Sequence, residues 1–94
     1  ETAIPIKREV RAACEMLGFD PLYVANEGKV IVILPDSKAL AALAALRNHP
    51  LGIDAAIIGK VTQSSASPRV SMNTLIGGTR IVDMLSGEML PRIC

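Results

Sequence analysis

The sequence is short of aromatic residues, cysteines and charge of one dominant sign. Its 94 residues include one Phe, one Tyr and no Trp, while half are hydrophobic, so any core must be aliphatic. Two cysteines, Cys14 and Cys94, are too few for a disulfide framework, and we expect reduced thiols. The net charge of +1 offers no general attraction to nucleic acid or to an anionic membrane.

Long apolar runs are also missing. No run approaches the roughly 20 residues needed to cross a bilayer, and the start, Glu1-Thr2-Ala3, lacks the pattern of a signal peptide. The cytoplasm is therefore the simplest compartment. The length suits one compact domain, and the missing initiator Met leads us to expect a piece cut from a longer protein.

Hydrophobic periodicity predicts an α+β domain over residues 1–85, with helices on one face of a small mixed sheet, followed by a flexible tail over 86–94. The predicted order is helix, strand, helix, strand, strand, with a possible further edge strand, over 6–17, 30–34, 37–48, 54–62, 69–74 and 79–85.

Several details of these elements can be predicted. Five apolar, mostly β-branched residues at 30–34 are typical of a central strand covered on both faces. The strands 54–62 and 69–74 could pair as a hairpin with a long connection. Gly18 follows the end of the first helix, and Asp36 or Ser37 could cap the second.

Cys94 is the sharpest chemical feature, because a thiol at the chain end is sterically open. The eight residues from Gly87 could span about 26 Å when extended, at roughly 3.3 Å each, and Pro91 favours that extension. Such a tail could deliver the thiol to a distant site. The alternative is an ordinary tail held on the surface by Leu90 and Ile93.

Other candidates are weaker when taken one at a time. Glu27 lies in a glycine-containing loop, where a carboxylate can project into a cleft, although a solvated turn is the simpler interpretation. The run 77–80, Gly-Gly-Thr-Arg, could wrap an anion, but such a Gly pair more often makes a bend, and it is no P-loop. Cys14 is predicted to be core, and the lone His49 cannot make a metal site.

Several motifs resemble the HypE family of hydrogenase maturation proteins, within the aminoimidazole ribonucleotide synthetase (PurM-like) superfamily. They are Gly-Gly-Thr-Arg-Ile-Val-Asp at 77–83, Leu-Ser-Gly-Glu at 85–88 and the ending Leu-Pro-Arg-Ile-Cys at 90–94. Pro-Leu-Tyr-Val-Ala-Asn-Glu-Gly-Lys at 21–29 and His-Pro-Leu-Gly at 49–52 resemble the same family's C-terminal domain. The resemblance covers essentially the whole chain.

The resemblance implies a carbamoyl dehydratase. In that family the terminal thiol, here Cys94, receives a carbamoyl group from the carbamoyltransferase HypF, and ATP drives its dehydration to a thiocyanate. The cyanide then passes to iron on HypC and HypD, for the NiFe hydrogenase centre. The resemblance further implies that ATP and Mg²⁺ are bound mainly by an N-terminal domain outside this chain, that the full-length protein is a homodimer, and that these residues alone are inactive.

The same resemblance suggests roles for individual residues. Glu27 is the candidate base that removes the nitrogen protons, and Asn26 could hold the amide or a phosphate. Arg80 and Arg92 are tentative contacts to substrate or nucleotide, and no metal ligands are expected in this chain. Two other interpretations stay open: an interaction module whose tail docks through Leu90 and Ile93, and a small-ligand regulatory domain of the βαβ kind.

Overall fold

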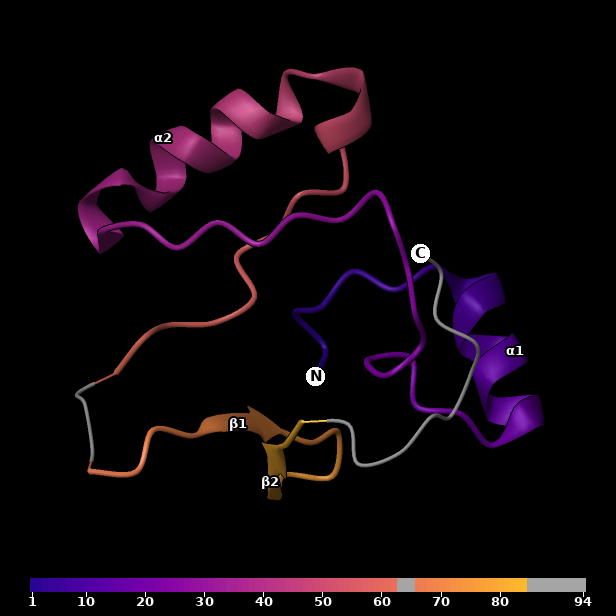
Figure 1. The fold of residues 1–94 in the computed structure, drawn as a ribbon. Helices are drawn as coiled ribbons and strands as arrows, with labels where there is room; N and C mark the ends of the chain where they lie inside the picture. The colour runs from indigo at the N-terminus through magenta and orange to yellow at the C-terminus, as the bar shows by residue number, and fades with distance from the viewer. Residues whose placement is uncertain (63–65, 85–94) are drawn as a thin grey trace. The chain divides into compact units, whose positions relative to one another are not determined.

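The computed structural model describes residues 1–62 and 66–84 (Figure 1). The chain divides into two compact units, one made of Glu1–Pro5 and Ile33–Asp83, the other containing Ile6–Val32. The predicted tail over 86–94 lies outside the described residues, so the division into a domain and a tail stays a prediction. Within the described ranges, no helix has the length and hydrophobicity that a membrane span requires.

Helix α1, Arg8–Leu17, starts two residues later than predicted and ends where predicted. Its end is set by Gly18, whose φ of 71° is left-handed, a conformation that glycine adopts without a steric penalty. The amide of Phe19 donates to the carbonyl of Cys14 at 2.8 Å, which closes the helix end in the manner of a Schellman motif. Cys14 itself is only 6% exposed, so its prediction as a core residue is confirmed.

Helix α2, Asp36–Arg47, agrees with its prediction to within one residue at each end. The predicted side-chain cap is wrong, because Asp36 is already the first helical residue and Pro35 occupies the capping position, where no side chain accepts a hydrogen bond. The negative charge of Asp36 in the first turn still suits the positive end of the helix dipole. A short 3₁₀ helix, η1, Pro50–Gly52, follows.

Strands β1, Val70–Asn73, and β2, Thr79–Val82, form a two-stranded antiparallel sheet (Figure 1). Val70 pairs with Val82 and Asn73 with Thr79. Met72 is buried, at 8% exposure, and with Cys14 it is one of two buried hydrophobic residues among those described. Two helices with a small sheet confirm the predicted α+β class.

Two predicted strands do not form. Residues 30–34 and 54–62 carry no strand pairing in the described part of the chain, and Val30 and Ile33 are 80% and 78% exposed. The predicted hairpin between 54–62 and 69–74 is also wrong, because β1 pairs with β2 instead. The physical reason is that a buried strand needs a neighbouring strand and covered faces, and the described residues supply neither to these segments.

Candidate functional site

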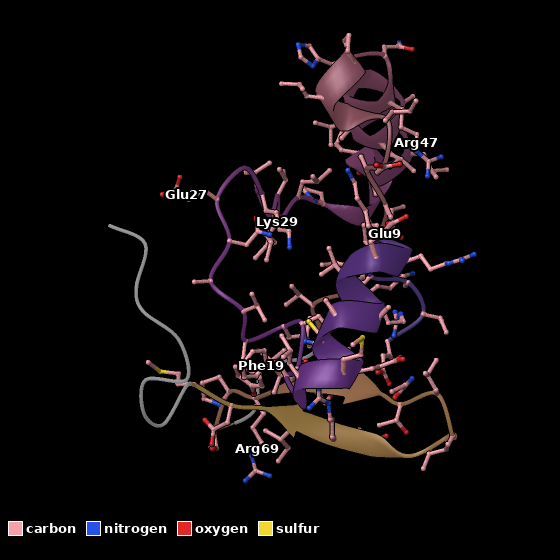
Figure 2. The ribbon with its side chains drawn as sticks, turned by 90° about the vertical axis from the view of Figure 1, so that its right-hand side faces the viewer. Glu9, Phe19, Glu27, Lys29, Arg47 and Arg69 are labelled. Atoms are coloured by element: carbon pink, nitrogen blue, oxygen red, sulfur yellow. The ribbon has the colours of Figure 1, made fainter. Side chains whose placement is uncertain are left out.

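The loop between α1 and residues 30–34 carries the two adjacent polar candidates, Asn26 and Glu27. Both are exposed. Gly28 follows with a φ of 79°, and a Cβ built at this position would meet nothing within 4 Å. Glycine is therefore required here by backbone conformation and not by lack of space. Figure 2 shows the Glu27 side chain at the outer bend of the loop, directed away from the backbone.

A short hydrogen-bonded turn holds the start of this loop. A carboxylate oxygen of Asp20 accepts from the amide of Leu22 at 3.0 Å, and the carbonyl of Asp20 accepts from the amide of Tyr23 at 3.0 Å. Phe19, Leu22 and Tyr23 are half-buried, whereas the loop beyond Ala25 is exposed. The loop therefore extends from an anchored base and presents an accessible carboxylate on Glu27.

The Gly-Gly pair forms the bend between β1 and β2. The amide of Gly77, a residue with a φ of 85°, donates to the carbonyl of Thr74 at 3.1 Å. The amide of Gly78 donates to Thr74 Oγ1 at 3.0 Å. Both amides are thus used inside the loop, which leaves neither free to cradle an anion. The simpler prediction, a bend, is confirmed.

Arg80 lies on β2, opposite Met72 in the register. Its side chain is half-buried and interacts with other groups of the protein. Arg80 belongs to the unit that contains Ile33–Asp83, whereas Asn26 and Glu27 belong to the unit that contains Ile6–Val32. Cys94 and Arg92 lie outside the described residues. The roles of the five predicted site residues therefore stay predictions.

Sequence reasoning missed a contact between the start of the chain and the hairpin. The Glu1 nitrogen donates to the carbonyl of Asn73 at 2.8 Å, and Glu1 Oε2 accepts from the amide of Leu75 at 3.1 Å. The partners are more than 70 positions apart in the sequence. No local pattern could signal them, because such a contact exists only once the chain has folded.

Possible metal ligands do not cluster in the described residues. In residues 1–62 and 66–84, no three His, Cys, Asp or Glu side chains gather closely enough to hold a metal ion. The His49 side chain instead makes a local hydrogen bond, in which His49 Nδ1 accepts from the amide of Leu51 at 3.2 Å. This bond stabilises the start of η1, directly after α2.

Comparison with known proteins identifies relatives along the whole chain. The chain is 58% identical over 94 residues to carbamoyl dehydratase HypE of Azotobacter vinelandii, and 53% identical to that of Rhodobacter capsulatus, spanning 27% of the length of each. It also matches a crystal structure of HypE, a hydrogenase maturation protein of E. coli, with a TM-score of 0.85 and 46% identity, over 100% of this chain and 28% of that one.

These matches confirm the resemblance to HypE predicted from the motifs, and they show that the chain spans about a quarter of the length of its relatives. The model of the AIR synthase related protein family, C-terminal domain, matches residues 1–70. That match covers well over half of the sequence and includes α1, α2 and η1. The chain therefore belongs to the AIR synthase related protein family, in the part that corresponds to its C-terminal domain.

Proposed function

We propose that this chain supplies the acceptor thiol of a full-length carbamoyl dehydratase. In this proposal Cys94 accepts a carbamoyl group, which is then dehydrated to a thiocyanate, the source of cyanide ligands for the iron of a NiFe hydrogenase. The observation that carries the proposal is the identity of 53% and 58%, over all 94 residues, with relatives named carbamoyl dehydratase HypE. The terminal Pro-Arg-Ile-Cys supplies the thiol that this chemistry needs.

Sulfur suits both halves of the proposed reaction. The Cys94 thiolate forms a bond to the carbamoyl carbon as the carbamoyl donor's leaving group departs, giving S–C(=O)–NH₂. ATP then phosphorylates the amide oxygen, the nitrogen loses its two protons, and the C–O bond breaks to give S–C≡N, ADP and phosphate. Because sulfur is also a good leaving group, the S–C bond can later break with departure of the thiolate, as the acceptor of the cyano group supplies the two electrons that make it cyanide.

Glu27 is the proposed base in the dehydration. Its carboxylate is exposed, and it lies on a turn that the positive φ of Gly28 defines. The exposure of the carboxylate and its position on a turn support a role for Glu27 as a base that contacts a substrate carried on the C-terminal segment. A base is needed because each proton lost from nitrogen must be accepted as the C≡N bond forms. We assign the neighbouring Asn26 to hold the amide or a phosphate, and Arg80 and Arg92 to contact substrate or nucleotide.

The nucleotide is proposed to bind mainly outside this chain. The amides of Gly77 and Gly78, the one glycine pair in the described residues, both donate to Thr74 within their own loop. These amides are therefore not available to bind a phosphate. We therefore assign ATP and Mg²⁺ to the remainder of the full-length protein, and we expect the 94 residues alone to be inactive. The proposal also includes HypF as carbamoyl donor, HypC and HypD as cyanide acceptors, a full-length homodimer and a cytoplasmic location.

The test uses the full-length protein with the carbamoyltransferase, carbamoyl phosphate and ATP. Mass spectrometry of the C-terminal peptide should detect a carbamoyl adduct on Cys94 and then its loss of water. Cys94→Ala should abolish both products. Cys14→Ala is the matched control and should retain them, because Cys14 is buried in α1 and remote from this chemistry in the proposal. An unmodified Cys94 in the complete system would contradict the proposal and favour the interaction module.

A further inference from the structure

Two turns of this chain are built in the same way, each from a polar residue, a proline and a leucine. A carboxylate oxygen of Asp20 accepts from the amide of Leu22 at 3.0 Å, and His49 Nδ1 accepts from the amide of Leu51 at 3.2 Å. Because the intervening proline has no N–H, the leucine amide is the first backbone donor after each acceptor residue. The two turns therefore differ in the chemistry of the acceptor.

The acceptor of the second turn depends on a proton. An ionised carboxylate only accepts hydrogen bonds, through either oxygen. An imidazole nitrogen accepts only while it carries no proton, and in the imidazolium both ring nitrogens are donors. His49 can therefore bind the Leu51 amide only as the neutral ring with its proton on Nε2.

The charged groups around this turn are few. They are Arg47, in the last turn of α2, and Asp54, which follows η1, whereas η1 itself carries no charged residue. Arg47 Nε donates to the carbonyl of Ala55 at 2.9 Å. The positive charge of Arg47 opposes an imidazolium, while the carbonyl end of α2 favours one. Within the described ranges His49 makes no ion pair, and its side chain is exposed to solvent protons.

We propose that His49 makes the turn at η1 a pH-sensitive element of the fold, closed while its ring is neutral and opened at the Leu51 amide when the ring is protonated. Histidine is the side chain whose charge ordinarily changes between about pH 5 and pH 8. As the pH falls through this range, Nδ1 gains a proton and becomes a donor that faces a second donor, the Leu51 amide. The contact then changes from attractive to repulsive. The turn at Asp20 keeps its bond, since carboxylates ordinarily stay ionised over this range.

The backbone bonds of the turn do not involve the ring. The amide of His49 donates to the carbonyl of Leu46 at 3.0 Å, and the amide of Gly52 donates to the carbonyl of His49 at 2.8 Å. We therefore expect protonation to free the Leu51 amide and to leave α2 intact. Because η1 joins α2 to residues 53–62, the direction in which that segment leaves the helix should become less fixed at low pH.

NMR of the full-length protein, labelled with ¹⁵N at histidine and leucine, tests this proposal independently of the proposed reaction. At about pH 8 the His49 ring nitrogens should show the neutral form with the proton on Nε2, and on acidification to about pH 5 the Leu51 amide shift should follow protonation of the ring. Leu22 is the internal control and should not follow it. A neutral ring with its proton on Nδ1 would overturn the proposal. So would a Leu51 amide that stays constant while His49 becomes charged.

Two variants define the closed and open states of the turn. His49→Asn keeps an acceptor at every pH, since an Asn side chain before proline makes the same kind of turn, whereas His49→Ala removes the acceptor. Relative to an unstructured amide at the same pH, Leu51 should exchange with water about 2- to 10-fold faster in His49→Ala than in His49→Asn. The wild type should resemble His49→Asn at about pH 8 and His49→Ala at about pH 5.

The variants also contain the outcomes that contradict the proposal. Equal exchange of Leu51 in His49→Asn and His49→Ala would show that the side chain at this position does not hold the amide. A Leu51 amide in His49→Ala that still responds to pH as in the wild type would assign the response to another group.

Discussion

Gly78 and Thr74 are joined by three hydrogen bonds across the β1–β2 loop. The amide of Gly78 donates to Thr74 Oγ1 at 3.0 Å, while the amide and the hydroxyl of Thr74 donate to the carbonyl of Gly78 at 2.8 Å and 3.2 Å. Together these bonds close the loop on itself. The glycine pair therefore shapes the hairpin, and its amides are not available to a phosphate.

Replacing Thr74 with Val should loosen this loop. The substitution removes the acceptor for the Gly78 amide and the hydroxyl that donates to the Gly78 carbonyl, and each hydrogen bond of this kind contributes about 0.5–1.5 kcal/mol. We expect the Gly78 amide of the full-length protein to exchange a few-fold faster, measured by NMR hydrogen exchange. Thr74→Ser keeps the hydroxyl and should exchange at the wild-type rate. If Val and Ser behave alike, the hydroxyl does not stabilise the loop.

Gly18→Ala should destabilise the end of α1. The φ of 71° at Gly18 is left-handed, and a side chain in that region costs about 1–2 kcal/mol. Gly59→Ala is a suitable control, since Gly59 has no positive φ and a Cβ there would meet nothing within 4 Å. Thermal unfolding of the full-length variants should give a lower midpoint for Gly18→Ala than for Gly59→Ala. The reverse order would contradict this account of the helix end.

Gly52→Ala should destabilise the protein for a different reason, which is lack of space. A Cβ at Gly52 would collide with the backbone carbonyl of Leu46, near the end of α2. Because a backbone atom cannot move aside as a side chain can, we expect a loss of about 1–3 kcal/mol, measured by chemical denaturation against Gly59→Ala. A wild-type stability for Gly52→Ala would show that η1 does not pack against Leu46 in this way.

Glu27→Gln should stop the proposed reaction at the carbamoyl stage. The amide retains the shape of the side chain but is a very poor proton acceptor, so carbamoylation of Cys94 should proceed while water loss stops. The tail-peptide mass reports both steps. Glu9→Gln on the exposed face of α1 is the matched control and should leave both steps intact. Normal water loss in Glu27→Gln would reassign the base to another group.

The elements that could be predicted are those set by short-range interactions. The end of α1 follows from a glycine placed directly after an amphipathic stripe, and the limits of α2 follow from Pro35 before it and Asn48 after it. The positions of β1 and β2 were also predictable, because turn-forming residues bound them. Each of these features depends on residues within one or two turns of the chain.

Pairing and site assembly were not predictable in the same way. The apolar residues 30–34 have the composition of a buried strand, yet they form no ladder in the described part of the chain, because a strand exists only with a partner and covered faces. The glycine amides of loop 74–78 could likewise either bind an anion or form a bend. Only the folded positions of Thr74 and Gly78 show that they form a bend.

The sequence by itself determined the helical stripes, the turn residues and the motifs that identify the family, because these depend on local order along the chain. Only the tertiary structure decided that β1 pairs with β2, that the Gly77 and Gly78 amides are consumed in their own loop, and that Glu1 binds the edge of β1 at Asn73. The Glu1–Asn73 contact joins residues 72 positions apart, so its free energy is gained only when folding brings both partners together, and the contacts of the hairpin form only when its loop closes.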